Sequence, residues 1–183
     1  LLLMGGRSLP HVMAMLIPEA WEGDKQLSTE TRAFYDYHSC LTEPWDGPAL
    51  MAFTDGVRIG ANLDRNGLRP FRYTVTKDNL LVMASEAGVM RIPPEDVLYK
   101  GRLRAGRMML VDPEEGRILD DEEIKADLAA RQPYGKWLAD NKVELNDLPP
   151  PPQVHQPDFD TLGERQRAFG YTQEDLGILM EPM

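Results

Sequence analysis

Cys40 and His38 are the two side chains that could form a nucleophile and base pair. A cysteine attacks a carbonyl carbon as its thiolate, and a neighbouring imidazole can accept the thiol proton. The segment before Pro44 predicts an amphipathic helix, and side chains at positions i and i+2 of a helix do not face each other. We therefore expect no Cys–His dyad and interpret Cys40 as a small buried thiol.

The sequence gives no support for a metal site or a dinucleotide site. His11 and His155 have no second ligand at metal-binding spacing, so we interpret them as surface or helix-face histidines. Cys40 is the only cysteine, which excludes an internal disulfide and an iron–sulfur site built within the chain. Gly5-Gly6 follows no strand and lacks the third glycine of a nucleotide-binding fingerprint.

The composition of the 183 residues excludes several classes of partner. A formal net charge of -10 disfavours binding to nucleic acids and to anionic membranes, which requires clustered Lys and Arg. The most basic stretch, residues 102–107, is interpreted as a solvated turn rather than a phosphate clamp. No run of about 18 apolar residues is present to span a bilayer. The length allows one ordinary core and the start of a second domain.

Helical periodicity is confined to the two ends of the chain. Ser8 and Ser28 are predicted to cap two helices, the first ending before Pro18 and the second before Pro44. Asp120, with Glu123 three residues later, predicts a third helix start. We expect a break at residues 133–135, a short helix after it, and a last helix capped at residues 172–175.

The middle of the chain has the pattern of short strands separated by turns. The apolar runs predict six strands, at about residues 49–54, 57–63, 71–76, 80–84, 97–103 and 107–111. Asp55-Gly56 indicates a tight hairpin in which both residues take positive φ. The regular spacing predicts an antiparallel meander with one face covered by helices, which is an α+β fold.

A second turn carries the residues of greatest functional interest. It has the sequence Asp64-Arg65-Asn66-Gly67-Leu68-Arg69-Pro70. We expect positive φ at Asn66 and Gly67, turn amides bound to Asp64, and Arg69 reaching carbonyls or a carboxylate such as Asp64 or Glu43. Glu86 follows an apolar strand, where it could line a pocket or accept hydrogen bonds in a turn. Trp45 is interpreted as a packed aromatic in a rigid, proline-flanked corner.

Several separated motifs resemble the glutamine amidotransferase domain of glutamate synthase large subunits. They are the turn at residues 64–70 and the segments Glu43-Pro44-Trp45-Asp46-Gly47-Pro48-Ala49, Gly5-Gly6-Arg7-Ser8-Leu9-Pro10-His11, Ile17-Pro18-Glu19-Ala20-Trp21, Ala84-Ser85-Glu86 and Arg167-Ala168-Phe169-Gly170-Tyr171. The resemblance extends over nearly the whole chain. It implies part of an αββα sandwich of the N-terminal-nucleophile type. Asp64, Asn66, Gly67, Arg69 and Glu86 would support the substrate pocket.

In that family a cysteine at the mature N-terminus attacks the amide of glutamine, and its own α-amino group acts as base. This chain begins with Leu1, so the resemblance implies an internal fragment that is inactive alone and has no catalytic residue. Its partner would be the remainder of the parent chain, above all the missing N-terminal segment. The parent would use ammonia, 2-oxoglutarate and reducing equivalents to make glutamate, with FMN and an iron–sulfur cluster that lie outside this chain. A cytoplasmic or stromal compartment is expected.

Four consecutive prolines, residues 149–152, suggest where the domains divide. We expect the amidotransferase portion at residues 1–148, a linker at 149–157 and the start of the central domain at 158–183. The competing hypothesis is a stand-alone, non-catalytic binding module that reuses the same sheet. Such a module would have to protect its strand edges with charges or prolines.

Overall fold

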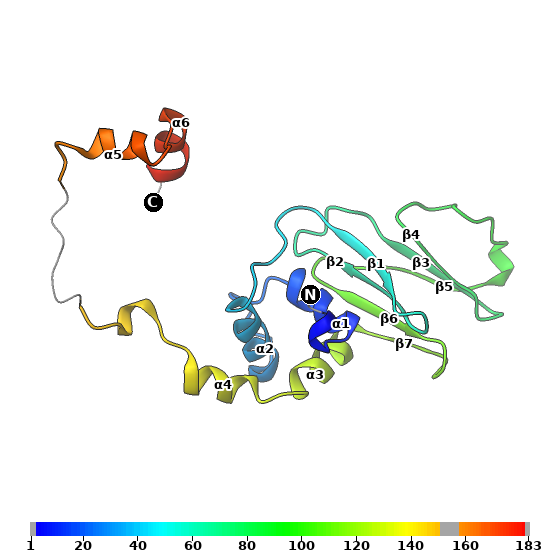
Figure 1. Ribbon diagram of the computed structural model, residues 1–183. Helices are drawn as coiled ribbons and strands as arrows, with labels where there is room; N and C mark the ends of the chain where they lie inside the picture. Colours follow the sequence, from blue (N-terminus) through cyan, green and yellow to red (C-terminus); the bar gives the residue numbers. More distant parts are fainter. Residues whose placement is uncertain (1–2, 151–157, 182–183) are drawn as a thin grey trace. The chain divides into compact units, whose positions relative to one another are not determined.

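A computed structural model describes residues 3–150 and 158–181. The chain divides into two units, Leu1–Lys142 and Val143–Met183, which are considered separately. The first unit contains four α-helices and seven strands (Figure 1). The helices are α1 (Leu9–Leu16), α2 (Thr29–Ser39), α3 (Asp121–Ala130) and α4 (Tyr134–Asn141). The strands are β1 (Leu50–Thr54), β2 (Ile59–Leu63), β3 (Arg72–Thr76), β4 (Leu81–Ala84), β5 (Val97–Arg102), β6 (Met108–Asp112) and β7 (Arg117–Leu119).

The seven strands form two antiparallel sheets, with the orders β1-β2-β6-β7 and β4-β3-β5. The antiparallel pairing, the α+β class and the covering helices are confirmed. The order differs from a simple meander, because β6 returns to pair with β2 while β3, β4 and β5 form the second sheet. Strand β7 was not predicted. The continuous apolar run in β6 agrees with its position inside the first sheet, since a strand buried on both faces lacks polar alternation.

The side chains of the first sheet are divided between two hydrophobic cores. Met108 and Leu110 of β6 pack in the larger core with residues of the four helices, including Phe34 of α2 and Leu128 of α3. Met109, between them, points to the opposite face and packs with residues of both sheets. Successive residues of a strand face opposite sides of its sheet. The first sheet, which contains β6, is therefore the layer between the helices and the second sheet. The smaller core comprises Ala61, Phe71 and Met109, with Leu50, Tyr73, Met83, Leu103 and Ile118 against it.

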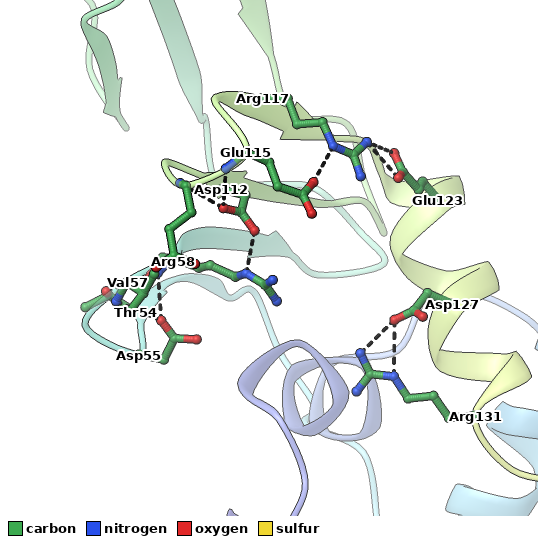
Figure 2. A network of polar contacts seen from close by, with 11 residues as sticks. Thr54, Asp55, Val57, Arg58, Asp112, Glu115, Arg117, Glu123, Asp127 and Arg131 are labelled. Atoms are coloured by element: carbon green, nitrogen blue, oxygen red, sulfur yellow. Dashed lines mark hydrogen bonds and ion pairs between the residues drawn. The ribbon is translucent and has the colours of Figure 1, made fainter.

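The β1–β2 hairpin differs in detail from the prediction. The last strand pair is Thr54 opposite Ile59, which leaves a four-residue loop, and positive φ occurs at Gly56 (94°) but not at Asp55. The Asp55 carboxylate instead accepts hydrogen bonds from the amides of Val57 (3.0 Å) and Arg58 (2.7 Å). Figure 2 shows Arg58 reaching from this loop to Asp112 at the end of β6, with 2.7 Å between Nε and Oδ2.

In the first unit, two of the three predicted helix caps are confirmed, and the third works differently. The Ser28 hydroxyl accepts from the Thr31 amide at 3.1 Å, and the Asp120 carboxylate accepts from the Glu123 amide at 2.9 Å. Ser8 stands at the N-cap of α1, but its hydroxyl makes no cap hydrogen bond there. It accepts instead from the Arg131 guanidinium at 3.1 Å, which links the start of α1 to the end of α3.

The second unit is short and has no buried residue in its helices. It contains α5 (Leu162–Ala168), α6 (Gln173–Asp175) and a π-helical turn, η4 (Leu176–Met180). Thr172 and Asp175 form a reciprocal capping box, which confirms the predicted start of the last helix. Helix α5 was not predicted. Residues 151–157, which include most of the predicted linker and His155, lie outside the described residues.

Candidate functional site

The turn that follows β2 is held by its backbone at three points. The Asp64 amide donates to the Ala49 carbonyl at 3.0 Å, and the Asp64 carbonyl accepts from the amides of Gly67 (3.1 Å) and Gly106 (2.8 Å). The Asp64 carboxylate accepts from the Asn66 amide at 2.8 Å through Oδ2. Asp64 thus binds turn amides as the sequence predicted. The turn is thus fixed to Ala49, directly before β1, and to the loop before β6.

Gly67 is required by both its conformation and its surroundings. Its φ is 64°, and a Cβ atom there would lie 2.6 Å from the Ala105 Cβ and 2.9 Å from the Ala105 Cα. The predicted positive φ is confirmed for Gly67 and wrong for Asn66, since Asn79 is the only non-glycine residue with positive φ in the described part of the chain. Asn66 is exposed. Only glycine fits a left-handed position this close to a neighbouring backbone.

One oxygen of the Asp64 carboxylate has no donor. Asp64 is 3% exposed, and Oδ1 is buried without a hydrogen-bond partner among the described residues. An unsatisfied buried polar atom costs about 1–3 kcal/mol, and more when it is charged. A carboxylate in this state is therefore poised to accept a hydrogen bond from a group outside the described residues.

Three motifs that are distant in the sequence meet at an open cleft of about 470 Å³, lined by Trp45, Arg69 and Glu86 among others. Arg69 and Glu86 are exposed, and Trp45 is 55% exposed. The predicted packing of Trp45 is therefore wrong, although its amide donates to the Leu16 carbonyl at 2.6 Å. The expected contacts of Arg69 with Asp64 or Glu43 are also wrong. Arg69 makes no ion pair or side-chain hydrogen bond within residues 3–150 and 158–181.

A buried ionic network supports the turn from the helix side. Lys125 Nζ lies 2.8 Å from both Glu19 Oε1 and Asp121 Oδ1, with all three side chains 8–10% exposed. Lys125 also donates to the Gly106 carbonyl at 2.9 Å, and the Gly106 amide donates to Asp64. The chain of contacts thus runs from α3 through Gly106 to the turn. Sequence reasoning missed it, because no local pattern signals contacts between residues 19 and 125.

Tyr35 joins the same network. Its hydroxyl donates to Glu19 at 3.1 Å, and burial together with the nearby Glu19 carboxylate raises the pKa of Tyr35 well above its ordinary value. Asp121 is bound further by the Arg107 guanidinium and by the Met108 amide, at 2.7 and 2.6 Å. Two cations and two carboxylates therefore balance one another, as a buried ionic cluster requires.

The two histidines near the N-terminus form a pair in the larger core. His11 and His38 are 8% and 3% exposed, and their Nε2 atoms lie 2.8 Å apart. His38 Nδ1 donates to the Phe34 carbonyl at 2.7 Å, so its Nε2 accepts and His11 Nε2 donates. Burial, reinforced by His38, lowers the pKa of His11 to about 4. The interpretation of His11 as a surface or helix-face residue is wrong with regard to its burial.

Cys40 is exposed, so its interpretation as a buried thiol is also wrong. It lies one residue beyond the end of α2, and its thiol contacts the Asp36 carbonyl at 3.4 Å. The two ring nitrogens of His38 contact His11 and the Phe34 carbonyl, so neither contacts the Cys40 thiol. The described residues contain no group of three or more His, Cys, Asp or Glu placed to hold a metal ion. They also contain no helix long and apolar enough to cross a membrane.

The family of the chain follows from comparison with known proteins. The model of the class-II glutamine amidotransferases matches residues 1–137, which include both sheets, the turn and the cleft. The chain therefore belongs to the class-II glutamine amidotransferases. An antiparallel two-sheet core covered by helices agrees with a part of the sandwich expected for that fold.

The chain is similar to glutamate synthases of several kinds. The glutamate synthase (NADPH) large chain of Bacillus subtilis is 52% identical over 98% of this chain and 12% of its own length. The glutamate synthase (NADH) of Schizosaccharomyces pombe is 44% identical over 96% of this chain and 9% of its own length. The ferredoxin-dependent glutamate synthase of Pyropia yezoensis is 45% identical over 100% of this chain and 12% of its own length. The resemblance predicted from the motifs is confirmed, and the chain corresponds to a small segment of these relatives.

Proposed function

We propose that this chain is the part of a glutamate synthase that completes the glutamine pocket of the amidotransferase domain. The observation that carries the proposal is the 41–52% identity to glutamate synthases over nearly the whole chain. In the complete protein, ammonia would be released from glutamine and combined with 2-oxoglutarate and reducing equivalents to give glutamate. The residues at 1–148 would belong to the amidotransferase portion, followed by the linker at 149–157 and the start of the central domain at 158–183.

Within that pocket the turn acts by holding and presenting groups. The backbone contacts of Asp64 and the close packing of Gly67 on Ala105 fix the turn beside the cleft. Asp64 Oδ1 would accept a hydrogen bond from the segment that carries the catalytic cysteine, or from glutamine itself. Arg69 and Glu86 are exposed at the cleft, where they would contact the same segment. Asn66 shapes the turn through its amide.

The electron donor and the cofactors belong to the rest of the proposed protein. The relatives include enzymes named for NADPH, NADH and ferredoxin, and similarity to all three does not select one donor. FMN and an iron–sulfur cluster would transfer the electrons in the parent. The single cysteine of this chain does not fit an iron–sulfur cluster, which requires several thiolates. We propose a cytoplasmic or stromal location, since some relatives are named chloroplastic.

A hybrid enzyme tests the proposed function. The matching segment of the Bacillus subtilis large chain is replaced by residues 1–183, and glutamate formation from glutamine, 2-oxoglutarate and NADPH is measured. We expect the hybrid to retain glutamine-dependent synthesis within about tenfold of the parent enzyme. A soluble hybrid that makes glutamate from free ammonia but not from glutamine would refute the proposal. The equivalent hybrid carrying the Pyropia segment is the control for the effect of exchange itself.

A further inference from the structure

We propose that four arginines at one end of the second sheet form a binding site for a small, multivalent oxyanion. A single open cavity of about 250 Å³ is lined by Arg69, Arg72, Arg102 and Arg104, together with Gly67 and Ala105. All four side chains are exposed, and none makes a hydrogen bond or ion pair within the described residues. The inference does not depend on the proposed function.

The strand register brings two of these arginines together at the surface. Arg72 of β3 lies directly opposite Arg102 of β5, so both project from the same face of the sheet. Tyr73, the next residue, points to the other face and packs against the smaller core. The arginine pair therefore faces away from the core. Like charges placed directly opposite each other destabilise a sheet, and a bound anion between them would remove that repulsion.

Charge is distributed unevenly along the chain in a way that favours an anion here. Residues 69–107 contain eight basic residues (Lys and Arg) but only four acidic ones (Asp and Glu). The rest of the chain contains twelve basic and twenty-six acidic residues. Elsewhere in the first unit, Arg58, Arg107 and Arg117 are paired with carboxylates, whereas Arg7 and Arg91 make no hydrogen bond or ion pair within the described residues. Four of the six unpaired guanidinium groups in the described part of this unit therefore line this cavity. The interpretation of residues 102–107 as a simple solvated turn does not account for that concentration.

The chemistry and the size of the cavity define the class of ligand. A guanidinium presents parallel N–H donors that match the oxygens of a carboxylate or phosphate, so several of them select a ligand with more than one such group. A space of about 250 Å³ accommodates a compact anion rather than a folded partner. Citrate and pyrophosphate are suitable probes because they are of similar size and each carries several anionic groups. The groups of citrate are carboxylates, and those of pyrophosphate are phosphates.

Calorimetric titration with citrate and with pyrophosphate tests this site, using sodium chloride at the same ionic strength as reference. We expect saturable one-site binding of at least one probe, and the stronger probe identifies the carboxylate or phosphate class. Replacing both residues of the pair, Arg72→Gln with Arg102→Gln, should weaken binding at least tenfold. Arg104→Gln alone should weaken it severalfold. The double variant Lys25→Gln with Lys77→Gln, at exposed lysines outside the cavity, should bind like the wild type.

Three results would overturn the proposal. The first is the absence of saturable binding by either probe. The second is equal weakening in the arginine and lysine variants, which would indicate a general charge effect. The third is binding of a hexaglutamate peptide without binding of either small anion, which would indicate a protein-docking surface. Circular dichroism of each variant verifies that the fold is intact before its affinity is compared.

Discussion

Gly67→Ala should destabilise the protein more than an alanine at a matched glycine. Gly67 and Gly116 have nearly the same φ, 64° and 67°, so alanine pays about 1–2 kcal/mol of backbone strain at either position. The gain from a stiffer unfolded chain is also shared and cancels in the comparison. The surroundings differ, because a Cβ at Gly67 would lie 2.6 Å from the Ala105 Cβ while nothing lies within 4 Å at Gly116. Overpacking of this kind costs about 1–3 kcal/mol more.

Urea unfolding followed by circular dichroism measures both variants under one set of conditions. We expect Gly116→Ala to lose about 1–2 kcal/mol in the free energy of unfolding and Gly67→Ala to lose about 2–5 kcal/mol. Equal losses would show that Ala105 moves aside freely, and the packing of the turn on the loop before β6 would then not be rigid. A double variant with Ala105→Gly should recover part of the loss at Gly67 if the clash is its cause.

Three further predictions concern the core and the exposed thiol. Lys125→Met leaves the buried Glu19 carboxylate without its cation and removes one of the two cations at Asp121, so it should cost about 3–5 kcal/mol in urea unfolding. Lys136→Met at an exposed pair should cost less than about 1 kcal/mol, and equal effects would contradict the network. His11 has a folded pKa of about 4 against 6.5 unfolded, so its contribution, at most about 3 kcal/mol, is complete above pH 6.5 and is lost as pH falls toward 4. The stability of His11→Gln should therefore vary less between pH 7 and 4.5 than that of the wild type, and an unchanged pH dependence would exclude this role. Cys40→Ser should leave stability within about 0.5 kcal/mol, because the thiol is exposed; a larger loss in urea unfolding would show that it packs.

Local patterns in the sequence predicted most elements of the fold. The cap at Ser28 and the glycine at position 67 depend on residues within three positions, and both are confirmed. The same is true of the strands, whose apolar runs are visible directly. The hairpin at Asp55 was located correctly but has a longer loop, because the carboxylate satisfies two loop amides without a positive φ.

Features that depend on distant contacts could not be predicted. The pairing of β6 with β2 brings together residues about 50 positions apart, and no turn signal encodes it. His11 and His38 are satisfied by each other, which a count of nearby metal ligands does not reveal. The local sequence around Lys125 predicts an exposed helix residue. Its burial depends on contacts with Glu19 and Gly106, which are distant in the sequence. Arg69 and Glu86 line one cleft because three segments that are distant in the sequence lie close together in the fold. No local pattern predicts this proximity.

We propose that the turn at Asp64 serves the glutamine pocket of a glutamate synthase. The most direct test introduces Asp64→Asn into the hybrid enzyme and compares glutamate formation from glutamine with that from free ammonia. The asparagine side chain keeps an oxygen that accepts from the Asn66 amide, but it places an NH2 donor at the position of Oδ1. That group cannot accept the hydrogen bond that we propose for Oδ1. Loss of a hydrogen bond to a charged group, about 1.5–3 kcal/mol, predicts a fall of at least about tenfold with glutamine and little change with ammonia. Undiminished glutamine-dependent activity, or an equal loss with both nitrogen sources, would contradict the claim.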